Sequence, residues 1–248
     1  MINSPKIICV SSGKGGVGKT SFSVNMACSL ARRGQQVLLV DGDLGLANVD
    51  VLLGLNVRHT LRETIDEERP LSSILVEIEP GFKVLPASSG VPEMANISYE
   101  EQAFLINELE NIIDRFDYVL VDSAAGIGDA VLWFNNWADN NIIILSPDPT
   151  AMTDAYALIK VLVHRFGKNR FHLLINNVKS KKEGRQVFNN MKNVLKKFLQ
   201  ISPDYLGAMP QDSAVVRAIR SQKPFLEISP DSRASRAVME ISSQILSM

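Results

Sequence analysis

Residues 11–20, with the sequence SSGKGGVGKT, constrain the fold more than any other part of the chain. Residues 7–10 are apolar or small and predict a short buried strand, and apolar residues over 21–33 predict a helix. A glycine-rich loop between a strand and a helix directs its backbone N–H groups and the positive end of the helix dipole at one point. The stretch therefore predicts a loop that wraps a chain of phosphates.

Four residues of this stretch fit the P-loop spacing G-x-x-x-x-G-K-[ST]: Gly13, Gly18, Lys19 and Thr20. In that arrangement Lys19 neutralises β- and γ-phosphate oxygens, and the Thr20 hydroxyl is placed to ligate magnesium. A glycine-rich turn with a chance lysine is the alternative, but the strand and helix on either side argue against it. The residues assigned to phosphate binding are Gly13, Gly15, Gly16, Val17, Gly18, Lys19, Thr20 and Ser21.

A second lysine, Lys14, directly follows Gly13. An ordinary P-loop does not need a cation there, and Lys14 comes too early to occupy the lysine position at the start of the helix. This position suggests that the Lys14 charge contacts a nucleotide other than the one bound by its own P-loop. The alternative is a solvated loop lysine.

Carboxylates stand at the ends of two more predicted strands, where open α/β sheets bind ligands. The strand over 36–40 leads into Asp41-Gly42-Asp43, and the strand over 117–122 ends at Asp122. We expect Asp41 to hold magnesium through water and Asp43 to orient or deprotonate the attacking water. We expect Asp122 to accept a hydrogen bond from a magnesium-bound water, as a Walker B acid does. The plainer interpretation of Asp41 and Asp43 is a pair of turn formers after a strand.

Strands and helices alternate along the rest of the chain. Further strands are predicted over 141–145, 171–178 and 205–210. Further helices are predicted over 60–69, from Thr150 or Thr153 to Phe166, and from Ser232 onward. A capping box of Ser98 and Glu101 predicts the start of one more helix. The pattern predicts a single α/β domain over residues 1–248, with a mostly parallel, twisted sheet and helices on both faces.

Apolar stripes indicate how the late helices pack. A core stripe on a basic helix is predicted from Val187, Met191, Val194, Leu195 and Phe198. A core-packing final helix, rather than a membrane anchor, is predicted from Ala234, Val238, Ile241, Ile245 and Met248. Cys9 and Cys28 form no C-x-x-C pair, so we expect both in the core, and we assign no metal beyond magnesium.

Charge is distributed unevenly, although the formal net charge is only −1. Residues 60–122 hold fourteen Asp or Glu against four Lys or Arg, whereas residues 160–200 hold eleven Lys or Arg against one acid. The basic region could attract an acidic partner, an anionic membrane or DNA, and the alternative is a set of solvated helix faces. Without a membrane-spanning run or secretory signal, we expect a cytoplasmic protein, with peripheral contact at the inner face of the cell membrane left open.

The run KGGVGKT over 14–20 resembles the deviant Walker A loop of the MinD/ParA (SIMIBI-class) P-loop ATPases. The run over 41–55, DGD followed by LGLANVDVLLGL, is similar to switch I of MinD-like proteins. The pattern P-T-x-x-T-D-A-Y-x-L-I-K over 149–160 is similar to the flagellar-number regulators of the FlhG/FleN type. The resemblance covers nearly the whole chain and is closest to this flagellar branch.

This resemblance implies a slow ATPase that needs ATP and Mg²⁺ and dimerises when ATP is bound. Lys14 would reach the partner's ATP, and with Lys19 and Asp43 it would form the catalytic set. Asp148 would lie near the dimer interface and the partner's ribose. Asn176, whose amide suits an adenine edge or local backbone groups, would bind adenine with help from the backbone near Pro210, Gln211 and Asp212.

Implied partners are a flagellar-placement GTPase, a flagellar switch component or a transcription regulator. An N-terminal Gln-rich segment and a C-terminal targeting helix, which relatives often carry, are not evident. The alternative function is a ParA-like ATPase that positions DNA or another cargo by ATP-dependent, nonspecific DNA binding through the basic region. An iron–sulfur scaffold ATPase would need a C-x-x-C, and a kinase or ligase would need a second-substrate pocket that no motif indicates.

Overall fold

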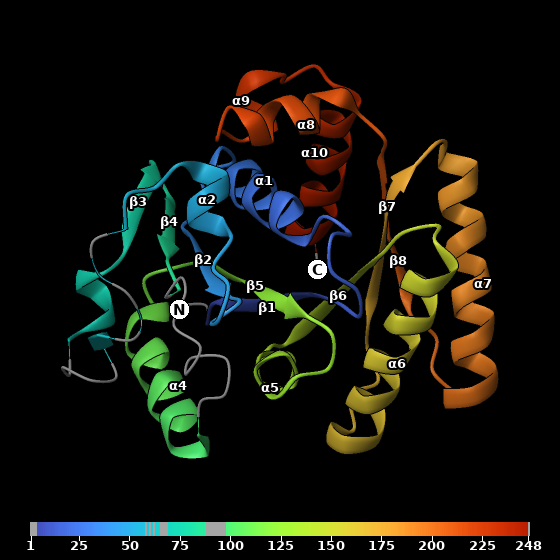
Figure 1. Ribbon diagram of the computed structural model, residues 1–248, viewed down its shortest axis with the longest axis horizontal. Helices are drawn as coiled ribbons and strands as arrows, with labels where there is room; N and C mark the ends of the chain where they lie inside the picture. Colours follow the sequence, from blue (N-terminus) through green and yellow to red (C-terminus); the bar gives the residue numbers. More distant parts are fainter. Residues whose placement is uncertain are drawn as a thin grey trace.

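The computed structural model describes residues 4–57, 59, 61, 63–64, 69–87 and 98–247. Their strands form one 8-stranded sheet in the order β3-β4-β2-β5-β1-β6-β7-β8 (Figure 1). All neighbours pair in parallel except β3 and β4, which are antiparallel. The strands are β1 (Lys6–Ser12), β2 (Val37–Gly42), β3 (Val76–Glu79), β4 (Phe82–Leu85), β5 (Tyr118–Ala125), β6 (Asn140–Leu145), β7 (His172–Val178) and β8 (Asp204–Pro210). This confirms the predicted mostly parallel sheet.

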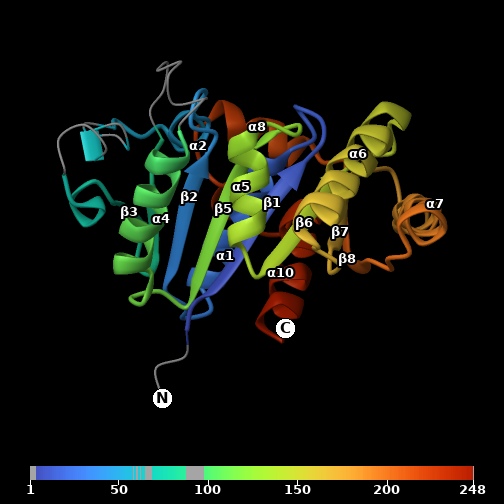
Figure 2. The same cartoon turned by 90° about the horizontal axis from the view of Figure 1, so that it is seen from below.

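Helices cover both faces of this sheet. Figure 2 shows α4 and α5 on one face and α1 and α10 on the other. The helices are α1 (Lys19–Ala31), α2 (Val49–Leu53), α4 (Tyr99–Ile113), α5 (Asp129–Trp137), α6 (Pro149–Phe166), α7 (Lys181–Leu199), α8 (Ser213–Arg220), α9 (Phe225–Ile228) and α10 (Arg233–Leu246), with the 3-10 helix η1 at Leu71–Ser73. Separate apolar clusters fill the space between the sheet and these helices on its two faces. The α/β class is thus confirmed.

Several local predictions are confirmed. The Ser98 hydroxyl accepts a hydrogen bond from the Glu101 N–H, and the Glu101 carboxylate accepts one from the Ser98 N–H, which completes the capping box of α4. Cys9 and Cys28 are buried free thiols. In α10 the described residues of the predicted stripe, Ala234, Val238, Ile241 and Ile245, are buried in the core. None of the described helices has the length and hydropathy of a membrane span.

Two local predictions are wrong. The cap of α6 is Asp148, whose carboxylate accepts a hydrogen bond from the Thr150 N–H, because Pro149 takes the first helical position, where no N–H is needed. On α7 the core stripe is shorter than predicted, because Val194 lies at its margin and Phe198 in the last turn, where the side chain is 61% exposed. The helix predicted over 60–69 falls largely outside the described residues.

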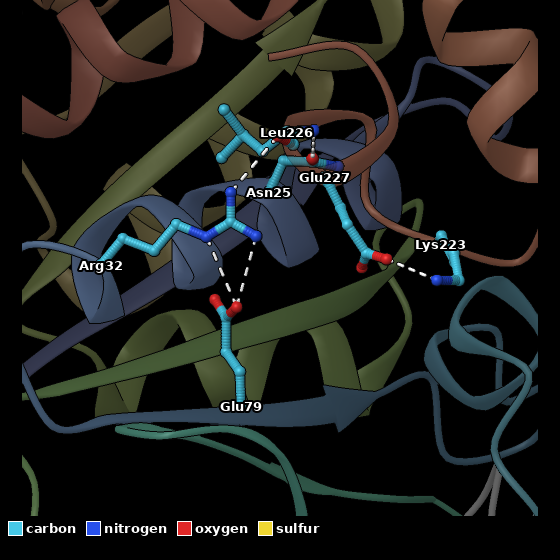
Figure 3. Close-up of polar contacts among 6 residues, drawn as sticks. All are labelled: Asn25, Arg32, Glu79, Lys223, Leu226 and Glu227. Carbon is cyan, nitrogen blue, oxygen red and sulfur yellow. Dashed lines mark hydrogen bonds and ion pairs between the residues drawn. The ribbon is translucent and has the colours of Figure 1, made fainter.

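A polar cluster fastens the short helix α9 to α1. The Arg32 guanidinium binds the Glu79 carboxylate and donates to the Leu226 carbonyl, and the Asn25 amide oxygen accepts a hydrogen bond of 3.0 Å from the Leu226 N–H (Figure 3). Lys223 and Glu227 form an ion pair in the same region. The contacts hold the segment after α8 against the helix that follows the P-loop, so the two parts share one wall of the site described next.

Candidate nucleotide site

Glycines at two positions of the P-loop leave no room for a side chain. Gly18 has φ of +93°, a left-handed conformation that favours glycine, and a Cβ there would lie 2.3 Å from the Asn176 amide nitrogen. A Cβ at Gly13 would lie 2.1 Å from the backbone of Asp154 in α6. The loop is therefore packed between α6 and the end of β7, and its last glycine, Gly18, is the N-cap of α1.

Lys19 begins α1 and lies beneath the loop. Its ammonium donates a hydrogen bond of 2.9 Å to the Ser12 hydroxyl, and the residue is buried. Burial lowers the pKa of Lys19, while the nearby carboxylates of Asp122 and Asp43 oppose that shift. A cation in this position is available to phosphate oxygens.

Asp122 lies at the centre of the sheet. Parallel pairing of β2 with β5 sets it directly beside Asp41. Its carboxylate accepts a hydrogen bond of 2.9 Å from the Ser23 hydroxyl, one turn along α1 from Lys19. Burial raises the pKa of Asp122 to about 6, against the effect of hydrogen bonds from Thr20 and Ser23 and of the Lys19 charge. Asp122, Thr20 and Lys19 are thus brought together as the sequence predicts.

Asp41 is fully buried and holds the segment that follows β2. Its carboxylate oxygens accept hydrogen bonds from the N–H groups of Asp43, Asn48 and Val49, at 3.1, 3.0 and 3.1 Å. Burial and the charge of Asp122 raise the pKa of Asp41 to about 8. The carboxylate fixes the start of α2, and its predicted role as a magnesium ligand stays a prediction.

Asp43 lines a cavity together with Lys19, Thr20 and Asp122. One carboxylate oxygen accepts a hydrogen bond from the Leu46 N–H at 3.1 Å, and the Asn48 amide lies 3.4 Å from the other. Burial raises the pKa of Asp43, while the Leu46 bond and Lys19 lower it. A carboxylate with a raised pKa beside a phosphate cradle can take a proton from water.

Two cavities, each of about 490 Å³, flank the P-loop and share Gly15, Gly16, Gly18, Ser21 and Ile219 as lining residues. The first, the phosphate-side cavity, is also lined by Lys19, Thr20, Asp43, Asn48, Val51, Leu52, Asp122, Ser123, Ala125 and Gln222. The second, the base-side cavity, is also lined by Lys14, Val17, Phe22, Ser146, Asp148, Asn176, Asn177, Met209, Pro210, Gln211, Asp212, Val215, Val216 and Phe225. Their arrangement matches a triphosphate on one side of the loop and a nucleoside on the other.

The predicted adenine residues surround the base-side cavity. The Asn176 amide nitrogen donates to the Val17 carbonyl at 2.6 Å, and its oxygen accepts from the Asn177 N–H at 2.8 Å, so local backbone occupies the amide. Pro210 ends β8, and the Asp212 carboxylate caps α8 by accepting from the Ala214 N–H. An adenine contact of Asn176 stays a prediction, since the structure shows the local alternative.

Lys14 lies at the rim of the base-side cavity and is bound within its own chain. Its ammonium donates hydrogen bonds to the Asp148 carboxylate at 2.7 Å and to the Thr150 hydroxyl at 2.5 Å. The Lys14 ammonium lowers the pKa of Asp148 to about 2, assisted by hydrogen bonds from Thr150. The Lys14 and Asp148 side chains are 39% and 45% exposed, so the pair faces solvent.

Several residues of the site escape prediction from the sequence. The Ser12 hydroxyl binds Lys19, the Ser23 hydroxyl binds Asp122, and the Gly126 N–H donates to the Ser12 carbonyl. Ser23 could have been found, because it lies four residues after Lys19 and so on the same helix face. Ser12 and Ile219 carry no comparable signal.

The residues present fit a magnesium nucleotide. The carboxylate oxygens of Asp122 and the hydroxyl oxygen of Thr20 are donors that a hard divalent cation prefers. The left-handed turns of the loop at Gly16 and Gly18 shape a cradle of the kind that binds phosphate. Fold and site together define a P-loop NTPase of the α/β class.

Comparison with known proteins narrows this class. The ParA family model, described as NUBPL iron-transfer P-loop NTPase, matches residues 3–246. The antiactivator FleN of Pseudomonas aeruginosa is 41% identical over 97% of this chain and 86% of its own length. The flagellum site-determining protein YlxH of Helicobacter pylori is 36% identical over 98% of this chain and 82% of its own length. A solved MinC:MinD cell division protein complex from Aquifex aeolicus matches with a TM-score of 0.81 at 26% identity, over 98% of this chain and 96% of the matched chain.

The chain belongs to the ParA/MinD family of P-loop ATPases. The predicted resemblance to that family and its flagellar branch is thereby confirmed. As a member of the family the protein is an ATPase.

Proposed function

We propose that this protein is an ATP- and Mg²⁺-dependent dimerisation switch that controls the number or placement of flagella. The observation that carries the proposal is the position of Lys14. It follows Gly13 in the P-loop, yet its ammonium lies at the exposed rim of the base-side cavity and binds Asp148 instead of sitting beneath the loop with Lys19. A cation at this rim is in a position to contact the nucleotide of a second copy of the protein.

The chain's own residues provide the elements of ATP hydrolysis. Lys19 neutralises the β- and γ-phosphate oxygens, and Asp43 accepts a proton from the water that attacks the γ-phosphorus as the bond to the β-phosphate oxygen breaks. Thr20 and Asp122 would hold Mg²⁺, which supplies charge neutralisation across the phosphates when bound. Asp41 keeps Asp43 and Asn48 in place through its three backbone hydrogen bonds.

Exposed apolar side chains at the nucleotide-site edge of the sheet support the proposed dimer. Leu46 and Val51 follow β2, Ile127 follows β5, and Val216 and Ile219 lie on α8 after β8. All three segments follow the carboxyl ends of parallel strands, so they lie at the same edge of the sheet as the nucleotide site. These five residues are between 47% and 71% exposed, and exposed apolar side chains at one edge of the sheet suit a protein interface.

The relatives supply the cellular role in the proposal. The names of FleN and YlxH refer to antiactivation and to flagellum site determination, and both proteins align with this chain over nearly all of its length. The solved MinD complex contains MinC, so that protein assembles with a partner. We infer that the ATP-bound dimer binds a protein partner, for which a flagellar-placement GTPase, a flagellar switch component and a transcription regulator are the candidates.

The dimer is tested by size-exclusion chromatography with mass detection. We expect monomer mass with ADP, and twice that mass with ATP and Mg²⁺ on an Asp43→Ala background that slows hydrolysis. Lys14→Ala on the same background should leave the protein monomeric while it still binds ATP. A monomer in every condition, with ATP demonstrably bound, would refute the switch. A deletion strain with unchanged flagellar number and placement would count against the flagellar role alone.

A further inference from the structure

A groove follows the free edge of β8, at one end of the sheet. Among the described strands, β8 pairs with β7 alone. Two cavities of about 260 and 240 Å³ touch this strand between Tyr205 and Pro210. The residues that line both cavities are Lys181, Ala208, Ala237 and Glu240. Because they share these residues, the two cavities lie next to each other along β8, and we call them together the β8 groove.

Helices α7 and α10 form the two walls of the β8 groove. Val187 and Met191 of α7 pack into the core on one face of the sheet, and Val238 and Ile241 of α10 pack into the core on the other. Figures 1 and 2 show these helices beside the β7–β8 end of the sheet. The groove therefore opens along the strand edge and not over a sheet face. At about 3.3 Å per residue, the strand from Tyr205 to Pro210 presents about 20 Å of edge.

The walls of the β8 groove are basic. Its described lining includes the cations Lys179, Lys181, Arg185, Arg233 and Arg236. Glu240 supplies the acid among the described lining residues. Arg233 and Arg236 donate to the backbone carbonyls of Gln211 and Asp231, which are uncharged acceptors. The groove thus carries an excess of positive charge along its length.

One exposed ion pair crosses the β8 groove. The Lys181 ammonium lies 3.3 Å from the Glu240 carboxylate, and these side chains are 90% and 64% exposed. Exposed pairs of this kind contribute about 0–1 kcal/mol, so a carboxylate from another molecule can displace Glu240 at little cost. Nearby, the Arg185 guanidinium lies 3.9 Å from the centre of the Tyr205 ring, which fixes a second cation at the groove wall.

We propose that the β8 groove binds an extended acidic segment of a protein partner, which adds to the edge of β8 while its carboxylates contact Lys181, Arg185 and Arg236. An edge strand offers backbone groups to an incoming strand, and the alternate side chains of that strand point toward the two walls. A strand edge of about six residues fits an extended chain, whose backbone groups are free to pair with it, better than a helix, whose backbone groups are already bonded to one another. Because the walls of the groove are basic, charge complementarity favours an acidic segment.

The test uses fluorescence anisotropy with a labelled peptide of about eight residues, about 26 Å when extended, in which pairs of neighbouring glutamates are separated by threonine or valine, so that carboxylates face both walls. The full-length protein should bind this peptide, and Lys181→Glu or Arg236→Glu should each weaken binding by about tenfold or more. The matched control is Lys196→Glu, the same charge change on the same helix but outside the groove lining. Binding to this control should stay within about twofold of the unmodified protein, and ATP hydrolysis by all three variants serves as the test of folding.

A second peptide separates strand addition from simple charge attraction. It has the same sequence with alternate backbone nitrogens methylated, so that it cannot complete a strand ladder. We expect its affinity to fall by about tenfold or more. Equal binding of both peptides, an equal loss with Lys196→Glu, or no binding of the unmethylated peptide would overturn the proposal.

Discussion

The P-loop end of the sheet and the β8 groove show opposite ways of placing charge on one fold. At the P-loop, Lys19, Asp122 and Asp41 are buried beside one another and bound by hydroxyl or backbone groups of the chain. In the β8 groove the cations are largely exposed, and the arginines Arg233 and Arg236 contact backbone carbonyls. Buried groups compensate one another and make a preorganised site, whereas the exposed groups leave an excess charge for another molecule. The first region therefore suits chemistry, and the second suits recognition.

The largest expected effect of a substitution is at the buried cation. Lys19→Ala removes the charge that faces the phosphates, and we expect ATP hydrolysis to fall by about 100-fold or more, since a single preorganised donor is worth a factor of about 10²–10³. Steady-state phosphate release measures this. Lys197→Ala, an exposed lysine on α7, is the control and should leave the rate unchanged. A Lys19→Ala protein with near-normal turnover would remove the distinction between the two regions.

The second effect concerns packing of the loop. Gly13→Ala would place a methyl group 2.1 Å from the backbone of Asp154, and we expect a loss of about 3 kcal/mol in the free energy of unfolding. Gly15→Ala is matched in chemistry, and its added Cβ would meet nothing within 4 Å. Its unfolding free energy should change by less than about 0.5 kcal/mol. Urea titrations of both variants would show whether the loop is held as tightly against α6 as the structure indicates.

The third effect is a pH dependence of stability that arises at the P-loop end of the sheet, from Asp41 and Asp122. Burial raises the pKa values of Asp41 and Asp122 to about 8 and about 6, from 3.8 in the unfolded chain. The folded state then binds more protons, so this contribution to stability falls as pH rises from about 4 to about 8. Thermal unfolding at several pH values should show this slope without nucleotide.

Magnesium nucleotide should reduce that slope, because a bound cation favours the ionised carboxylates. Asp122→Asn should reduce it as well, since one of the titrating groups is removed. A slope of opposite sign that persists in Asp122→Asn would mean that the two carboxylates do not dominate the pH response.

The smallest effect is expected in the β8 groove. Lys181→Ala breaks an exposed ion pair with Glu240 and should change the unfolding free energy by less than about 0.5 kcal/mol. The same substitution should still weaken binding of the acidic peptide. A large loss of stability instead would make the pair part of the fold and leave no reason to expect that a ligand displaces it.

Sequence reasoning locates the first region well and the second hardly at all. The P-loop spacing and the strand-end acids Asp41, Asp43 and Asp122 are local patterns, so the order of residues is enough to place the phosphate site. The strands are predictable for the same reason, since apolar runs bounded by turn residues mark each one. The sequence also indicates a basic region over 160–200, but not which of its cations gather at one place.

Contacts between distant residues account for the features that the sequence does not predict. Lys14 and Asp148 are separated by 134 residues, and their ion pair depends on α6 starting beside the P-loop. The β8 groove exists because α7 and α10 pack on opposite faces of the last strand, which no single segment of sequence encodes. The exposure of Phe198 has a similar origin, because helical periodicity predicts a buried face without showing which turn of α7 is covered.

A mixing experiment tests most directly whether Lys14 serves a second molecule. A Lys14→Ala subunit retains its own P-loop lysine, and a Lys19→Ala subunit retains the lysine that would be offered to its partner, while each variant alone should be nearly inactive. If Lys14 acts across a dimer, mixing the two variants creates one complete site per mixed dimer, and ATP hydrolysis should reappear well above the sum of the separate rates. A mixture that remains as inactive as its components would contradict the account.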